Sequence, residues 1–214
     1  MPAKDRLDSL AARIVAEPAL HARWLNTFSY LEYVGFRKIV KSQRAEALTA
    51  AILGHACEEG RHALALKKLA IKLGGAEFDS YSPETLLCGE EAKSYFQELD
   101  KNCDEAFADR AEAERARLTY AYVTLLVERR ALRVYHTYKA ALGETEIARK
   151  LTSLLAEETK HLSDIEALLR AADPGFLARS AKFAVIEEAL YQRFIDALTR
   201  EVAPLSAERV AHSP

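Results

Sequence analysis

Apolar residues recur along most of the chain at the spacing of three or four residues that places them on one face of a helix. The two-residue alternation typical of strands is nearly absent. The composition is rich in Ala, Leu, Glu, Arg and Lys, and only 8 glycines and 6 prolines interrupt it. The sequence therefore predicts an all-α protein.

Helix breakers divide this pattern into segments. They include Glu17-Pro18, Gly74-Gly75 and Asp173-Pro174-Gly175. We expect helices at about 4–16, 19–41, 44–73, 90–107, 110–141, 145–171 and 176–202. The polar stretch 41–46 should hold a turn with Ser42 as a cap, and Pro83 should start a helix within the connection 74–93.

Length and composition set limits on the architecture. The 214 residues suffice for one domain with a substantial core, and no linker divides them, so we expect a single domain over 1–214. Net charge is −2, which gives no reason to expect a membrane or a nucleic-acid partner, although a local basic patch stays open.

The three cysteines form no CxxC pair, so the sequence predicts no disulfide framework and no thiolate metal site. The first residues are amphipathic and carry acids, unlike a signal peptide. No stretch approaches the roughly 18 apolar residues of a membrane span. We therefore expect a cytoplasmic protein.

Two similar five-residue motifs carry the candidate chemistry. They are EEGRH at 58–62 and EETKH at 157–161. Within each, Glu and His lie three residues apart, on one face of a helix: Glu59 with His62, and Glu158 with His161. Chance repetition among charged surface residues is the alternative interpretation, since Glu pairs on helices are mostly solvated.

Each motif has a further Glu on the preceding helix. Glu128 and Glu158 lie equally far from Gly143, next to Thr145, which can cap the following helix. Glu32 and Glu59 lie 27 residues apart, on either side of the polar stretch 41–46. Each helical arm is about 14 residues, or about 20 Å, long. All the acids would then lie at mid-height between antiparallel helices.

Apolar neighbours place these acids on inward faces. Phe28 and Phe36 are one turn from Glu32, and Leu125 and Leu132 are near Glu128. Buried carboxylates without a counter-charge would be very costly. Two divalent cations would balance four carboxylates, and oxygen ligands with one imidazole per metal suit iron or manganese.

The order Glu32, Glu59/His62, Glu128, Glu158/His161 resembles the ferritin-like di-iron carboxylate superfamily, over about residues 19–171. The resemblance implies a ferritin-like four-helix bundle with a long crossover connection and additional N- and C-terminal helices. It implies two iron ions, with manganese or a mixed pair as alternatives. Glu59 and Glu158 would bridge the metals, His62 and His161 would each bind one, and Glu32 and Glu128 would complete the coordination.

Further residues are expected around this centre. Glu58 and Glu157 should accept hydrogen bonds from the histidine of the opposite motif, with Arg61 and Lys160 neutralising them. His55 lies one turn before Glu59, on a similar face. A core histidine or one behind the metal ligands is favoured there over a third histidine ligand. The candidate catalytic or pocket residues are Tyr135, Phe28 and Thr124.

The resemblance leaves the reaction open. An oxidase or monooxygenase of hydroxylase type would use O2 or peroxide, a small apolar substrate and a separate electron donor protein. Relatives of this size include tRNA-modifying hydroxylases, although the charge balance argues against tRNA. The alternatives are a ferroxidase or iron-binding protein of bacterioferritin type, a peroxide reductase of rubrerythrin type, and a bundle without activity. A homodimer is the default expectation.

Overall fold

The computed structural model describes residues 3–42, 45 and 48–203. Across these residues the secondary structure is helical, with short 3-10 turns and no strand, so the all-α prediction is confirmed. The helices are α1 (Ala3–Ala16), α2 (Pro18–Ser42), α3 (Ala50–Gly74), α4 (Gly89–Glu105), α5 (Glu112–Leu142), α6 (Glu146–Ala172) and α7 (Phe176–Val202).

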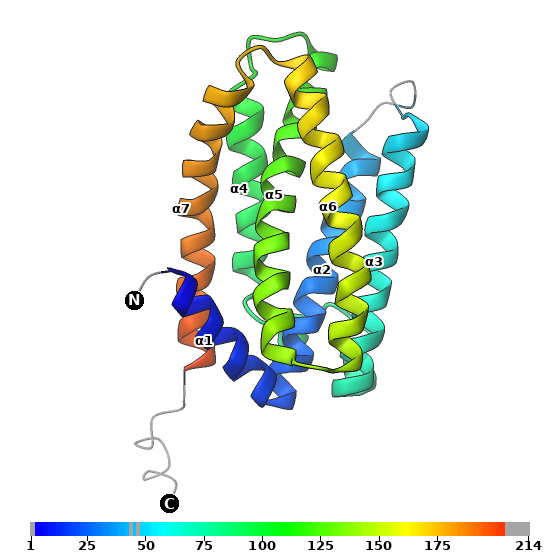
Figure 1. Cartoon of the computed structure of the whole chain (residues 1–214), viewed down its shortest axis with the longest axis vertical. Helices are drawn as coiled ribbons and strands as arrows, with labels where there is room; N and C mark the ends of the chain where they lie inside the picture. Colours follow the sequence, from blue (N-terminus) through cyan, green and yellow to red (C-terminus); the bar gives the residue numbers. More distant parts are fainter. Residues whose placement is uncertain (1–2, 43–44, 46–47, 204–214) are drawn as a thin grey trace, which may run out of the picture.

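Two antiparallel helix pairs run along the length of the molecule. α2 packs along α3, and α5 packs along α6 (Figure 1). The pairs meet where α2 contacts α5 and where α3 contacts α6. The space between the two pairs is therefore enclosed by four helices.

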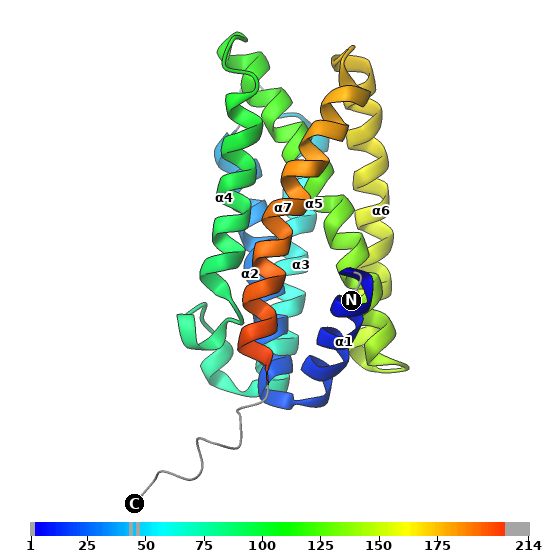
Figure 2. The ribbon, with the colours of Figure 1, turned by 90° about the vertical axis from the view of Figure 1, so that its left-hand side faces the viewer.

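The other three helices cover one side of these pairs. α4 lies within the connection from α3 to α5 and packs against α5 and α7 (Figure 2). α1 packs near one end, against α5 and α2. The side of the molecule formed by α2 and α5 is thus shielded by α4 and α7.

The start of α3 differs from the sequence prediction. The helix begins at Ala50, not near Arg44, because Thr49 is extended and its hydroxyl accepts a hydrogen bond from Ile52 N, 3.3 Å away. Ser42 is the last residue of α2 and does not cap α3. The turn predicted at 41–46 lies partly outside the described residues, at 43–44 and 46.

The other predicted breaks lie close to their expected positions. α3 ends at Gly74, and α5 ends before Gly143, whose φ of 59° lies in the left-handed region that favours glycine. Thr145 caps α6 by accepting a hydrogen bond from Ala148 N, 3.2 Å away. Pro83–Thr85 forms a single 3-10 turn, shorter than the helix expected there.

A buried lysine ties the crossover to the helix pairs. Lys67 on α3 donates to Asn26 Oδ1 on α2 at 2.5 Å and to the carbonyl oxygen of Ser80 at 2.7 Å. A third bond reaches the carbonyl oxygen of Phe78, 3.1 Å away, and the amino group lies over the ring of Tyr81. These contacts fix the first part of the crossover against α2 and α3.

Apolar side chains fill the interior, as the helical pattern predicts. On α7 the inward face buries Phe183, Leu190, Phe194 and Leu198, while Ile186 is half-buried. No helix among the described residues combines the length and the apolar character that crossing a bilayer requires.

Candidate metal centre

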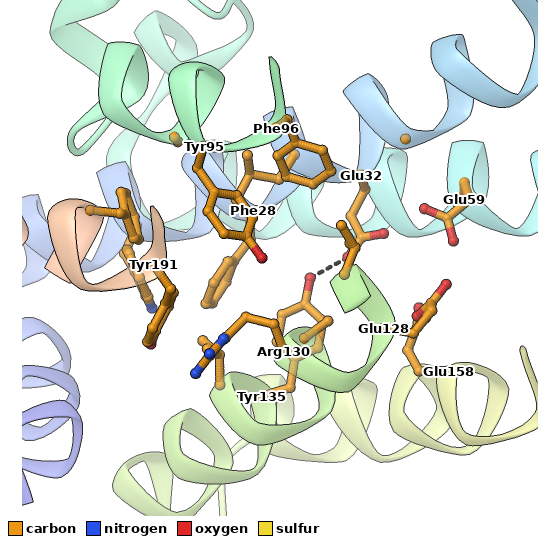
Figure 3. A pocket seen from close by; sticks show the side chains of 18 residues that line it. Phe28, Glu32, Glu59, Tyr95, Phe96, Glu128, Arg130, Tyr135, Glu158 and Tyr191 are labelled. Atoms are coloured by element: carbon orange, nitrogen blue, oxygen red, sulfur yellow. Dashed lines mark hydrogen bonds between the residues drawn. The ribbon is translucent and has the colours of Figure 1, made fainter. Parts of the chain in front are cut away.

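Six side chains predicted from the sequence converge between the two helix pairs. They are only 2–8% exposed. Together with His55, they offer potential ligand atoms that form two overlapping groups, in each of which all atoms lie within 4.8 Å of one another. One group is Glu32, Glu59, His62 and Glu158, and the other is His55, Glu59, Glu128 and His161. Glu59 belongs to both groups, and the four acids gather at one place (Figure 3).

The local helix geometry explains this convergence. The three-residue spacing in α3 and in α6 places each Glu and His pair on one face of its helix. Opposite α3, Gly35 of α2 leaves room for the carboxylate of Glu59. A Cβ atom at position 35 would lie only 2.9 Å from Glu59 Oε2. The glycine therefore lets the two helices approach with an acid between them.

The outer nitrogen of each histidine donates to an acid of the other motif. His62 Nε2 lies 2.8 Å from Glu157 Oε2, and His161 Nε2 lies 2.6 Å from Glu58 Oε2. The structure thus places Glu58 and Glu157 where the sequence interpretation expected them. With Nε2 held in this way, the Nδ1 atom of each ring faces the four carboxylates.

The two basic residues of the motifs behave differently. Arg61 forms two hydrogen bonds to Glu157, at 3.1 and 3.2 Å, and lies 4.0 Å from Glu58. Lys160 pairs instead with Asp164, one turn further along α6, at 3.0 Å. Among the described residues, Lys160 therefore forms no direct ion pair with Glu58 or Glu157, the two acids that it was expected to neutralise.

The four central acids raise the cost of one another's ionisation. Every ion pair formed by the four central acids, within the described part of the chain, is with a histidine. Burial, together with Glu32 and Glu158, raises the pKa of Glu59 well above its ordinary value. Burial and Glu158 do the same to the pKa of Glu128. All four carboxylates would therefore be ionised together only if additional positive charge lay among them.

Three buried atoms at the centre have no hydrogen-bond partner. They are His62 Nδ1, His161 Nδ1 and Glu158 Oε1. His62 Nδ1 lies only 2.9 Å from Glu158 Oε1, yet the two atoms do not form a hydrogen bond. Atoms that are close together without bonding each other are typical of ligands that point toward a shared cation. The residues therefore fit a pair of divalent metals held by oxygen and imidazole.

His55 lies closer to the centre than the sequence predicted. Its Nδ1 is 2.9 Å from the hydroxyl of Tyr120, and its Nε2 is 3.2 Å from Glu59 Oε1 and 3.4 Å from Glu128 Oε1. Burial lowers its pKa to about 4, so the ring is neutral near pH 7. The position of His55 one turn before Glu59 indicated that it lies near the centre. The contact with Tyr120 could not be predicted, because no nearby residue in the sequence indicates it.

An apolar cavity of about 90 Å³ adjoins the acids on the side covered by α4 and α7. Phe28, Leu31, Phe96 and Val134 are among its lining residues, and Glu32 and Glu128 form its inner end (Figure 3). Tyr135 also lines it and donates a hydrogen bond to Glu32 Oε1. Phe28 and Tyr135, both predicted from the sequence, thus lie in this cavity.

The outer end of the cavity is polar, and its arginine is paired with acids. Arg130 donates from Nε and Nη2 to the carboxylate of Glu187, at 2.8 and 2.7 Å. Tyr95 donates to the same carboxylate at 2.7 Å, and Arg130 also reaches Glu188 at 2.6 Å. Sequence reasoning missed this buried cluster, because its members come from three helices far apart in the chain.

Thr124 lies away from this cavity. It lines a smaller cavity of about 40 Å³ beside His55 and Tyr120, and also an outer cleft of about 730 Å³. His55, Glu58 and His161 line the same cleft. The histidine side of the centre is therefore reached by a second, more open route.

Comparisons of this chain with models of protein families, with curated proteins and with solved structures find no match.

Proposed function

We propose that the protein is a non-haem di-iron oxidoreductase that uses O2 to oxidise a small apolar substrate. The observation that carries this proposal is the set of three buried atoms that lack a hydrogen-bond partner, His62 Nδ1, His161 Nδ1 and Glu158 Oε1, amid four carboxylates. Buried polar atoms without partners are rare and costly, and a pair of cations would satisfy all three.

The fold proposed with this function is a ferritin-like four-helix bundle. α2, α3, α5 and α6 would form the bundle, with α4 in its long crossover and α1 and α7 added at the ends. In this class one Glu comes from each of two helices and a Glu-x-x-His pair comes from each of the other two. The candidate ligands follow that distribution.

The ligand groups support roles for individual residues. Glu59 belongs to both groups and would bridge the metals, and we propose Glu158 as the second bridge, because it contacts both His62 and His161. Glu32 and His62 would complete one position, and Glu128 and His161 the other. Iron suits these ligands, and manganese or a mixed pair would also be accepted.

When bound, the iron pair would supply the O2 chemistry that protein side chains cannot provide. For a hydroxylation, one O2, two electrons from a separate donor protein and two protons yield the hydroxylated product and one water. The side chains of the protein would position the candidate ligands. Glu58 and Glu157 hold the two imidazole rings, and Tyr135 holds Glu32 where the cavity meets the acids. Burial raises the pKa of the Tyr135 hydroxyl, which therefore stays protonated and donates.

The cavity favours an organic substrate over iron oxidation alone. A ferroxidase of bacterioferritin or rubrerythrin type needs to admit only iron and O2 or peroxide. Here an apolar space ends against Glu32 and Glu128, and Arg130 at its far end is already neutralised by Glu187. A small, uncharged, apolar molecule suits such a lining best.

The test begins with metal binding. Anaerobic titration with Fe(II), followed by elemental analysis, should give two iron ions per chain for the unaltered protein. Glu59→Ala and Glu158→Ala should each abolish binding of the pair, since each removes a proposed bridge. Glu105→Ala, on the exposed surface of α4, is the control and should retain both ions. Two ions per chain after either bridge substitution would contradict the assignment.

The reaction is tested on the loaded protein. With a chemical reductant and a set of small hydrocarbons, we expect O2 uptake and products heavier by one oxygen atom. Assembly into a large shell that accumulates iron mineral, with no organic product, would instead support the ferroxidase alternative. The two outcomes are separated by size-exclusion chromatography and mass spectrometry.

A further inference from the structure

We propose that His55 is a seventh metal ligand, so that the two metal positions differ, one having a single imidazole and the other having two. The inference rests on the proposed function, because it assigns a residue to the same metal pair. The two sequence motifs supply one histidine for each metal position. His55 would add a second histidine to one of these positions.

The three imidazoles near the acids are held in a similar way. His62 and His161 each donate from the outer nitrogen to a carboxylate and turn the inner nitrogen toward the acids. His55 is arranged in the same manner. Its outer nitrogen, Nδ1, contacts Tyr120 at 2.9 Å, and its inner nitrogen, Nε2, faces Glu59 and Glu128. An outer hydrogen bond that fixes the ring is a regular feature of histidine ligands.

The ligand groups also place His55 at the second position. Its inner nitrogen lies within 4.8 Å of the potential ligand atoms of Glu59, Glu128 and His161. The rings of His55 and His161, which come from two different helices, have centroids 4.3 Å apart. With Glu59 and Glu158 as bridges, each position would have four residues before His55 is counted, and His55 would be a fifth at the second position.

A simple hydrogen bond from His55 to Glu59 explains the geometry less well. Nε2 lies almost equally far from two carboxylate oxygens on different helices, at 3.2 and 3.4 Å. One N–H group can align with only one of these oxygens. A nitrogen lone pair directed between them, toward a cation that both carboxylates also bind, accounts for both distances.

The proposal makes the two positions chemically distinct. Both positions would share Glu59 and Glu158 and would have one further carboxylate each, but the first would have one imidazole and the second two. Carboxylates suit manganese and imidazoles suit iron, so a mixed supply should place manganese at the first position. Metal ions should therefore fill the two positions in two resolved steps.

The decisive measurement uses the unaltered protein. Pulsed EPR on the one-electron-oxidised iron pair counts the imidazole nitrogens bonded directly to metal. We expect three. A count of two in a protein that binds two iron ions would overturn the role of His55 while leaving the proposed function intact. Failure of the unaltered protein to bind two metals would instead remove the proposed function.

Substitutions give an independent test by Co(II) titration. His55→Ala and His55→Gln should keep the first site and weaken the second by more than the roughly 10- to 100-fold typical of losing an outer hydrogen bond. Tyr120→Phe should stay within that range, and the exposed His136→Ala should change nothing. Unchanged affinity of both sites in the two His55 variants would overturn the proposal.

The outer cleft allows a rescue experiment. His55 lines a cleft of about 730 Å³, so free imidazole can reach the space left by His55→Ala. Added imidazole should restore the second binding step and its Co(II) absorption band in this variant and leave the unaltered protein unchanged. If circular dichroism shows intact helices but imidazole at saturating concentration restores nothing, the proposal is contradicted.

Discussion

His161 on α6 donates a hydrogen bond from Nε2 to Oε2 of Glu58 on α3, over 2.6 Å. The reverse contact, from His62 on α3 to Glu157 on α6, spans 2.8 Å. Each motif therefore orients the imidazole of the other. Since the outer bond fixes both the tautomer and the direction of the ring, the two motifs depend on each other for their geometry.

This exchange predicts the effect of neutralising the outer acids. Glu58→Gln or Glu157→Gln should leave two metals per chain but lower metal affinity by roughly 10- to 100-fold, because an amide holds the ring less firmly than a carboxylate. Fe(II) or Co(II) titration gives the measurement. Lys160→Met is the matched control, since Lys160 pairs with Asp164 and should not affect affinity. Identical affinities for all three variants would place the two acids outside the site.

Gly35 offers a test of how closely α2 must approach α3. Gly35→Ala would place a Cβ atom 2.9 Å from Glu59 Oε2, and the carboxylate would have to move. The cost in folding should be small, because that atom ends a flexible side chain, while metal affinity should fall. Gly54→Ala is the control, as nothing lies within 4 Å of its Cβ position.

Both glycine substitutions should gain helix propensity, by up to about 1 kcal/mol. Urea unfolding of the metal-free proteins, combined with metal titration, separates the two effects. Full metal affinity in Gly35→Ala would mean that Glu59 does not need its observed position.

The cavity can be tested apart from the metals. Ala92 on α4 is buried and lines it, at a distance along the chain from every proposed ligand. Ala92→Leu should fill much of the space, destabilise the fold by about 1–3 kcal/mol and retain two metals. Product formation should fall while O2 uptake continues. Ala65→Leu, on the exposed surface of α3, is the control. Undiminished product formation would exclude the cavity as the substrate site.

His21 predicts a pH dependence of stability that is independent of the centre. Burial lowers its pKa from 6.5 to about 4, and its Nε2 lies 2.5 Å from the hydroxyl of Tyr138. Between these pH values the unfolded chain binds a proton on His21 that the folded chain does not. Stability from this group is therefore complete above about pH 6.5 and is lost as the pH falls toward 4.

The measurement is urea unfolding of the metal-free protein at about pH 7.5 and about pH 5. His21→Gln should lose less stability between the two conditions than the unaltered protein. Since other histidines also titrate in this range, the difference between the two proteins is the quantity that matters. Equal losses would show that His21 is protonated in the folded state.

Local rules predicted those parts of the molecule that depend on nearby residues. The spacing of Glu59 and His62, the break at Gly143 and the cap at Thr145 each follow from helix geometry within a few residues. The bounds of α7 follow from Asp173-Pro174-Gly175 and the apolar face beyond it. The start of α3 was misjudged because residues 44–48 have good helix formers, whereas the Thr49 cap determines where the helix begins.

Contacts between distant elements could not be read in the same way. Arg130 and Glu187 pair across 57 positions of the chain, and neither position has a periodic signal that names the other. The opening left by Gly35 depends on how closely two helices pack. The link from His55 to Tyr120 depends on the rotation of α5 against α3. Such details follow from tertiary packing and not from local sequence.

The crossed hydrogen bonds between the motifs also bear on how the chain acquires its centre. During synthesis, α2 and α3 are complete well before α6 exists, and at that stage His62 has no Glu157 to hold it. Neither helix pair, α2 with α3 or α5 with α6, contains all the candidate ligands by itself. If cations bind here as proposed, high affinity would therefore require that α5 and α6 have docked onto α2 and α3.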